Sequence, residues 1–193
     1  MKKTIMILTA AFLTAFAQHN FSAILDKYIN SPVEIDFEQK TYWHVREKES
    51  KFKGKIILGT SDKFNISVNR MTYVCDGKTF WEYDSRQKRV TVQKVLPGLS
   101  KSIPTELLKL LKNADFTENK QANSIIWQDK ETVKNGYEKV EVFFAASQIS
   151  KIITLDTEKN VTTYTFEKTA FLKSVSDNIF KFAIPQGVKV YED

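Results

Sequence analysis

The chain has 193 residues, of which 42% are hydrophobic and 27% are charged, with only 6 Gly and 4 Pro. This composition is typical of one globular domain with a sizeable core, and it excludes a largely disordered chain. The formal net charge of +6 favours attraction to anionic surfaces such as lipid headgroups, although the lysines are scattered along the chain.

Residues 1–17 have the features of an export signal. Lys2 and Lys3 precede an apolar run, and Ala15 and Ala17 fit the small-x-small rule for cleavage after Ala17. The run is too short to span a bilayer with margin, so a retained membrane anchor is the weaker alternative. We therefore expect an exported, soluble domain over residues 18–193, for which nucleic acid is not a partner.

The next predicted element is a short amphipathic helix. Asn20 suits the N-cap position, and Ser31-Pro32 ends the helix because the residue before proline avoids helical backbone angles. Since a helix of about ten residues is marginal alone in water, it must pack on an apolar surface. Its apolar face comprises Phe21, Ile24, Leu25, Tyr28 and Ile29.

Alternating apolar and polar residues predict strands through the first half of the chain. A charged loop is expected at Glu47–Lys53, and Asp76-Gly77 predicts a two-residue hairpin turn because both turn positions need positive φ. The strands expected in this half are 33–46, 54–58, 63–68, 71–75, 80–83 and 90–92.

The second half contains one more helix and further strands. Pro104–Lys112 is predicted to be helical, since proline suits the first turn and four leucines form a broad apolar face. Asn135-Gly136 predicts a second hairpin turn, and Pro185–Val188 a turn before a last short strand. The other strands expected here are 125–127, 137–145, 151–156, 161–171 and 179–184.

About ten strands with mostly tight connections predict a mainly β domain of the α+β class. An antiparallel sheet of that size curls, and two apolar helices with no helical bundle to join must pack on its concave side. We therefore expect a single curled antiparallel sheet that forms an unclosed β-barrel, with the short helices as a lid over an apolar hollow.

Motifs for catalysis, metal binding or cofactor binding are missing. The chain has two histidines, His19 and His44, and no metal-ligand spacing, phosphate-binding glycine loop or nucleophile motif. Its single cysteine, Cys75, cannot form an internal disulfide and is expected to be a small buried hydrophobe. We therefore expect no enzyme activity, no cofactor and no metal, with an exported hydrolase as a minor alternative.

Several local sequences occur in an order that resembles one known family. They are Phe37–Gln39, Gly54–Leu58 with Lys63–Asn65, Asp76–Tyr83, a helix opening at Pro104, and Phe182–Val188. The hairpin is similar to Asp-Gly-x-x-Leu-Trp-x-Tyr and the closing segment to Phe-x-x-Pro-x-Gly-Val, both of the LolA family of periplasmic outer-membrane lipoprotein carriers. The matches span nearly the whole chain after residue 17.

The resemblance implies a LolA/LolB-like fold in the periplasm that binds the acyl chains of lipoproteins in its interior. It implies as partners acylated lipoproteins, an inner-membrane lipoprotein-releasing ABC complex and an outer-membrane acceptor, with transient membrane contact by a monomer. The best-known members carry an arginine that helps hold the lid shut, where this chain has Thr60. Ile66 replaces the second aromatic residue of the same family motif.

The resulting hypothesis is a carrier that shields lipoprotein acyl chains in an apolar cavity and shuttles them from the inner to the outer membrane. The candidate lining consists of Phe64, Ile66, Val68, Trp81, Tyr83, Val90, Val92, Val140, Val142, Phe144, Tyr164 and Phe166. The candidate lid residues are Leu107, Leu108, Leu111, Leu25 and Tyr28. Ordinary core packing is the alternative for each residue, and a non-transporting periplasmic sensor of the same fold is the alternative function.

Overall fold

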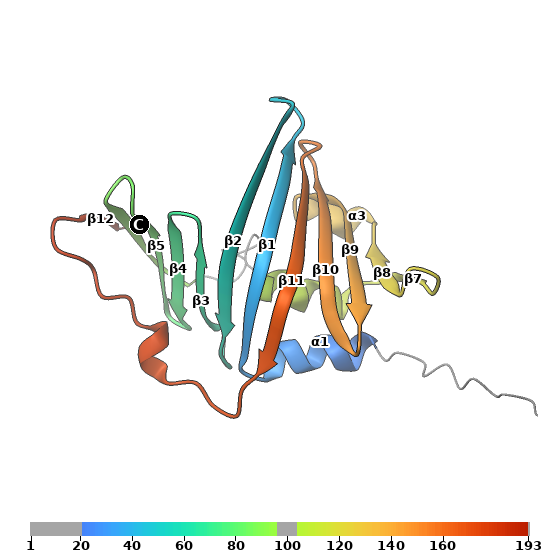
Figure 1. The fold of residues 1–193 in the computed structure, drawn as a ribbon, viewed down its shortest axis with the longest axis horizontal. Helices are drawn as coiled ribbons and strands as arrows, with labels where there is room; N and C mark the ends of the chain where they lie inside the picture. The colour runs from blue at the N-terminus through green and yellow to red at the C-terminus, as the bar shows by residue number, and fades with distance from the viewer. Residues whose placement is uncertain (1–20, 96–103, 193) are drawn as a thin grey trace, which may run out of the picture.

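The computed structural model describes residues 21–95 and 104–192 (Figure 1). The predicted export signal, Asn20 and the loop after Val95 lie outside these residues. In chain order the elements are α1 (Phe21–Asn30), β1 (Val33–Trp43), β2 (Lys48–Leu58), β3 (Lys63–Val68), β4 (Met71–Asp76), β5 (Thr79–Asp84), β6 (Arg89–Lys94), α2 (Pro104–Asn113), β7 (Thr117–Asn119), β8 (Ser124–Trp127), α3 (Lys130–Lys134), β9 (Tyr137–Ala145), β10 (Gln148–Asp156), β11 (Val161–Phe171), the 3-10 helix η1 (Asp177–Phe180) and β12 (Lys189–Glu192).

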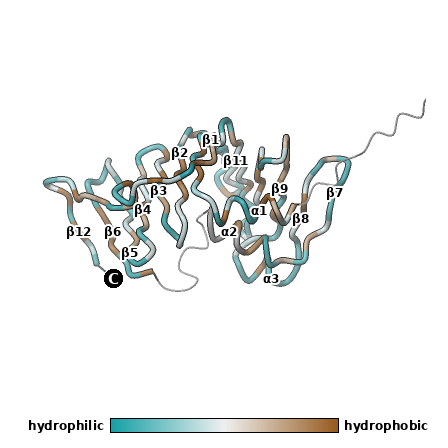
Figure 2. The backbone as a smooth tube through the Cα atoms, turned by 90° about the horizontal axis from the view of Figure 1, so that it is seen from below, coloured by the Kyte–Doolittle hydropathy of each residue, from teal (hydrophilic) through white to brown (hydrophobic). Residues whose placement is uncertain are grey.

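All the strands belong to one sheet in the order β12-β6-β5-β4-β3-β2-β1-β11-β10-β9-β8-β7. Neighbouring strands are antiparallel except β12, which runs parallel to β6. The sheet curves into an arch, and α1, α2 and α3 lie within its concave side (Figure 2). Its end strands β12 and β7 do not pair, so the predicted mainly β fold with an unclosed barrel is confirmed.

The longest hairpin, β1–β2, corrects one prediction. Its register runs from Val33↔Leu58 to Trp43↔Lys48, so residues 48–53 of the segment expected to be a charged loop belong to β2. The turn lies earlier, at residues 44–47, of which the first three were expected to be strand. Two lysines of residues 48–53 lie on the opposite side from Phe37, where Lys51 pairs with Glu38 and Lys53 with Glu167. A strand can therefore carry this many charges, because ion pairs along neighbouring strands satisfy them.

The Asp76-Gly77 hairpin is present, but its turn residues are shifted by one from the prediction. Cys75 pairs with Phe80, and of the expected pair only Gly77 has positive φ, at 89°. The Asp76 carboxylate instead accepts hydrogen bonds from the backbone N–H groups of Lys78 and Thr79, at 2.9 and 2.8 Å. Asp76 thus stabilises the turn from its first position, as aspartate commonly does.

Two further predictions are wrong: the hairpin turn at Asn135-Gly136 and the strand at residues 179–184. Asn135-Gly136 ends α3, with Gly136 at φ 85° and its N–H bonded to the Val133 carbonyl, as at many helix C-termini. Residues 179–184 do not join the sheet, since η1 occupies the first of them and the rest is extended without strand pairing. The strands and helices expected from the sequence also did not include β7 or α3.

Strands β4 and β5 carry apolar side chains on both faces of the sheet, and the register separates the two sets. We call the side that carries α1 and α2 the concave face and the opposite side the convex face. Phe64 lies opposite Cys75, and Cys75 lies opposite Phe80, so these three side chains share the concave face. Because side chains alternate along a strand, Val74 and Trp81 point to the convex face.

Candidate functional site

The concave face presents a continuous apolar surface from β8 to β4. Opposed residues in neighbouring strands carry this surface from one strand to the next, and most of them are fully buried. It includes Ile125, Trp127, Val140, Val142, Phe144, Ile152, Val33, Ile35, Phe37, Ile56, Leu58, Phe64, Ile66 and Cys75. The alternation of apolar and polar residues along the strands is sufficient to produce this surface, whereas the lid of the expected site requires the helices.

Helix α1 is anchored to one end of this surface. The Tyr28 hydroxyl accepts a hydrogen bond from the Ile149 backbone N–H at 3.1 Å, and burial raises the pKa of this tyrosine. The Phe21 ring packs at 4.6 Å from Phe144, and the Tyr28 ring stands edge-on to Phe171 at 5.1 Å. These contacts fix α1 as part of the core, although Leu25 and Tyr28 were predicted to belong to the lid.

Helix α2 rests on the same surface through its leucines. Leu107, Leu108 and Leu111 are all buried in the core cluster. Lys112 forms an ion pair at 2.5 Å with Asp26 of α1, and both side chains are about two-fifths exposed. A helix held by packing and a solvent-screened ion pair can separate from the sheet more easily than one anchored like α1.

Aromatic side chains line the concave face beyond the core cluster. The Tyr73 ring stacks on Phe80 at 6.3 Å and 4°, and Phe64 packs on the same Phe80 ring at 6.0 Å. Tyr73, Phe80 and the predicted lining residues Val68, Tyr164 and Phe166 are only partly buried. Of the described helices, none lies under β4–β6 in Figure 2, so this part of the surface is less covered.

The structure divides the twelve predicted lining residues between the two faces. Phe64, Ile66, Val68, Val140, Val142, Phe144, Tyr164 and Phe166 lie together on the concave face. The prediction that four others share this surface is wrong, because the register places Trp81, Tyr83, Val90 and Val92 on the convex face. Counting residues across the two tight hairpins between Phe64 and Trp81 would have revealed this.

The convex face of β3–β5 is covered by residues 172–188, which we call the C-terminal segment. Lys63 forms an ion pair with Asp177 at 2.8 Å, and the Asn65 side chain donates to the Ile179 carbonyl at 2.8 Å. The Phe182 ring packs at 5.3 Å from Tyr83. Phe180 is fully buried, so this segment closes a second, separate core.

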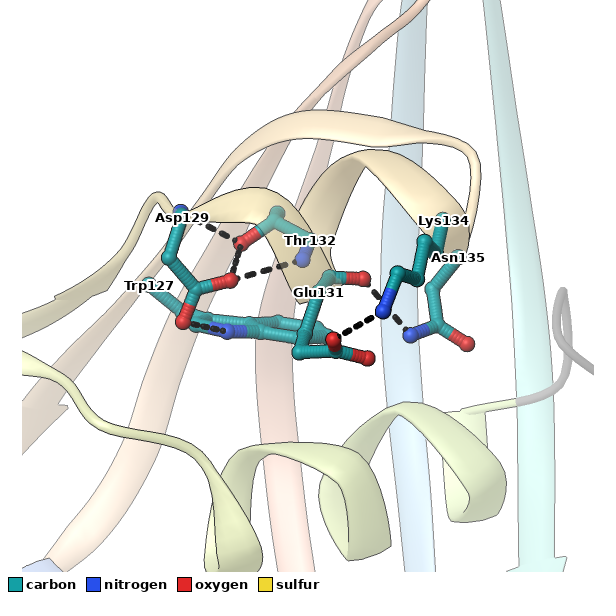
Figure 3. A network of polar contacts seen from close by, with 6 residues as sticks. All are labelled: Trp127, Asp129, Glu131, Thr132, Lys134 and Asn135. Atoms are coloured by element: carbon teal, nitrogen blue, oxygen red, sulfur yellow. Dashed lines mark hydrogen bonds and ion pairs between the residues drawn. The ribbon is translucent and has the colours of Figure 1, made fainter.

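A polar network at α3 holds Trp127 on the concave face (Figure 3). The Trp127 indole N–H donates to the Asp129 carboxylate at 3.1 Å, and Asp129 forms a capping box with Thr132 at the start of α3. Hydrogen bonds from Thr132 lower the pKa of Asp129. This helix was not among those expected from the sequence, although aspartate is one of the residues that commonly precede a helix.

The described residues contain no group of His, Cys, Asp and Glu side chains that could hold a metal ion. Among the described helices, none is long and apolar enough to cross a membrane. The site consists of a large apolar surface with an amphipathic helix resting on it.

A sequence model described as outer membrane lipoprotein carrier protein LolA matches residues 31–183. A search of curated protein sequences gave no match. The fold is similar to that of an uncharacterized conserved protein from Thermus thermophilus, with a TM-score of 0.55 at 8% identity over 89% of this chain and 96% of that one. A LolA superfamily protein from Nitrosomonas europaea gives 0.48 at 10% identity over 83% and 96%. Because the family match covers most of the sequence, the chain belongs to the LolA family, a family of carriers rather than of enzymes.

Proposed function

We propose that this protein binds the acyl chains of lipoproteins on its concave face and shuttles lipoproteins through the periplasm from the inner to the outer membrane. The observation that carries the proposal is α2, a helix whose leucines cover an apolar surface that would otherwise face water. A guest fatty chain could take the place of these leucines. The eight concave-face residues named above, with Leu107, Leu108 and Leu111, are the proposed contacts.

The energies of the two occupants are of similar size. Shielding about ten acyl methylenes from water stabilises a complex by about 8 kcal/mol. Burying three leucine side chains contributes about 5–9 kcal/mol. Because the helix and the guest compete for one surface at comparable energies, cargo can both enter and leave, as a carrier requires.

In this proposal α1 stays in place and α2 moves. Thr60, at the position where the resemblance places an arginine, is exposed and uncharged. The ion pair between Lys112 and Asp26 is the contact that joins the two helices by charge in this chain. In this proposal the contact that holds α2 closed is made with α1, and not with the turn that contains Thr60.

The proposal extends to the partners. Loading requires an inner-membrane releasing complex of the ABC type, and delivery requires an outer-membrane acceptor, because an acyl chain does not leave a bilayer for water unaided. The supporting evidence is the family membership together with the apolar concave face.

Purified protein incubated with a triacylated lipoprotein in detergent-free buffer tests the proposal. The protein should keep the lipoprotein soluble and then lose it to added acceptor membranes. Hydrogen exchange of α2 amides should rise on loading, while α1 amides, as the internal control, stay protected. A stable complex that is never transferred would indicate a sensor, and failure to keep the lipoprotein soluble would refute the proposal.

A further inference from the structure

The end of the β1–β2 hairpin exposes large apolar side chains that no described element covers. Tyr42, Trp43 and Val45 are 41%, 40% and 86% exposed, and Val161 on the adjacent β11 is 36% exposed. We call these four residues the hairpin tip. This hairpin projects beyond the neighbouring strands, away from α1 (Figure 1). So many exposed apolar side chains in one place indicate an interaction surface.

The hairpin tip is held in shape by its own hydrogen bonds. The His44 backbone N–H donates to the Asn160 side chain at 3.0 Å, which ties the β1–β2 turn to the β10–β11 turn. The Trp43 indole N–H donates to the Ser50 hydroxyl at 3.1 Å. The aromatic side chains are therefore presented by a positioned pair of turns, which reduces the entropy lost on binding.

The apolar groups lie on both faces of the sheet. Tyr42 is directly opposite Val161, so these two side chains share the convex face. Trp43 follows Tyr42 along the strand and points to the concave face. A protein partner would approach one face, whereas an end that is apolar on both sides suits insertion into a lipid layer.

Two basic side chains at the end of the β1–β2 hairpin can contact an anionic surface. Below it the charges are paired, Lys40 with Glu49 and Lys51 with Glu38. Arg46 and Glu47 lie in the turn and Lys48 begins β2, and within the described residues neither basic side chain forms an ion pair. Lysine and arginine beside a bilayer are each attracted to anionic lipid.

We propose that the hairpin tip docks the protein on membranes by entering the headgroup region of an anionic lipid bilayer. Tryptophan and tyrosine favour this region because each combines a large apolar ring with one polar N–H or O–H group. Arg46 and Lys48 then lie at the level of the phosphates. The proposal goes beyond cargo binding and does not depend on it, because empty protein and lipoprotein-free vesicles suffice to test it.

The test is co-sedimentation with vesicles of phosphatidylglycerol and phosphatidylcholine, compared with phosphatidylcholine alone. The chain from Gln18 is used, since the contacts described above lie within residues 21–192 and the apolar N-terminal run would bind lipid by itself. We expect binding to the anionic vesicles. Trp43→Ser with Val45→Ser should weaken it about tenfold or more. Arg46→Gln with Lys48→Gln should also weaken it about tenfold or more and abolish the preference for phosphatidylglycerol.

The matched control is Val133→Ser with Val190→Ser, which removes exposed valines of α3 and β12 and should leave binding unchanged. A second measurement is tryptophan emission, which should shift to the blue on adding anionic vesicles in the unaltered chain and not in Trp43→Phe. Circular dichroism should show every variant folded, because all the substituted side chains are partly or largely exposed. The proposal would be overturned if the unaltered chain bound neither vesicle. It would also be overturned if Trp43→Ser with Val45→Ser, or Arg46→Gln with Lys48→Gln, bound as strongly as the unaltered chain.

Discussion

The two faces of the sheet are both apolar in part, yet they are covered in different ways. On the convex face the C-terminal segment adds an ion pair, a hydrogen bond and a buried phenylalanine to its ring contact. On the concave face α2 covers its part of the sheet mainly with leucines. A cover joined by several directional contacts is structural, whereas one held mostly by apolar packing can be exchanged for an apolar guest. This difference predicts separate effects for substitutions on the two faces.

The largest effect is expected on the convex face. Phe180→Ala should lower the free energy of unfolding by about 3–5 kcal/mol, because it removes a buried ring from the second core. Its exposed neighbour Ile179→Ala is the matched control and should change stability little. Denaturant unfolding gives the stability, and lipoprotein binding per folded molecule should be unchanged. Loss of cargo binding at full stability would break the distinction between the faces.

A pair of adjacent residues sharpens the comparison. Phe80 lies on the concave face and Trp81 on the convex face. Phe80→Ser should weaken binding of an acyl probe about tenfold or more, because it removes apolar area from the proposed site. Trp81→Ser should reduce stability without changing the affinity for the probe. Titration with a fluorescent fatty acid measures the affinity of both variants. A loss of affinity in Trp81→Ser but not in Phe80→Ser would assign the site to the convex face.

The ion pair between the helices should have a smaller effect. Lys112→Met keeps the side-chain stem but removes the charge that faces Asp26, which costs less than about 1 kcal/mol for a partly exposed pair. We expect acyl probes to bind a few-fold faster, since α2 leaves the sheet more easily. Lys134→Met removes the Glu131–Lys134 pair of α3 and serves as the control. Unchanged probe kinetics in Lys112→Met would show that this pair does not control the lid.

The smallest effect concerns pH. The pKa of Asp129 lies below its ordinary value of 3.8, mainly because the Thr132 backbone N–H bonds the carboxylate. Because the pKa of this carboxyl is lower in the folded protein, its ionised form stabilises the fold at any pH above the ordinary pKa. This contribution is lost as the pH falls through the folded-state pKa. Asp129→Asn keeps a capping acceptor but cannot titrate, so the NMR shift of the Trp127 indole N–H should lose its acid transition. Persistence of that transition in Asp129→Asn would assign it to another carboxyl.

The spacing of apolar residues was sufficient to predict a helix or strand where that spacing is compatible with only one kind of element. The apolar spacing of α1 and α2, and the alternation in Lys63–Val68 and Tyr137–Ala145, predicted elements that the structure confirms. It failed where a signal serves two structures. Asn135-Gly136 suits a hairpin turn and a helix end equally, because both need positive φ at the glycine. The capping box of α3 was overlooked because the helix is only one turn long.

The sequence by itself determined the class of fold, the absence of catalytic motifs and, within each strand, which predicted lining residues share a side. Only the tertiary structure decided that Trp81, Tyr83, Val90 and Val92 belong to a second core, and that α1 is anchored while α2 rests on leucines. The physical reason is that alternation fixes which residues lie together on one side of a strand. It does not fix which side meets the helices, because that depends on pairing across hairpins and on a segment a hundred residues away.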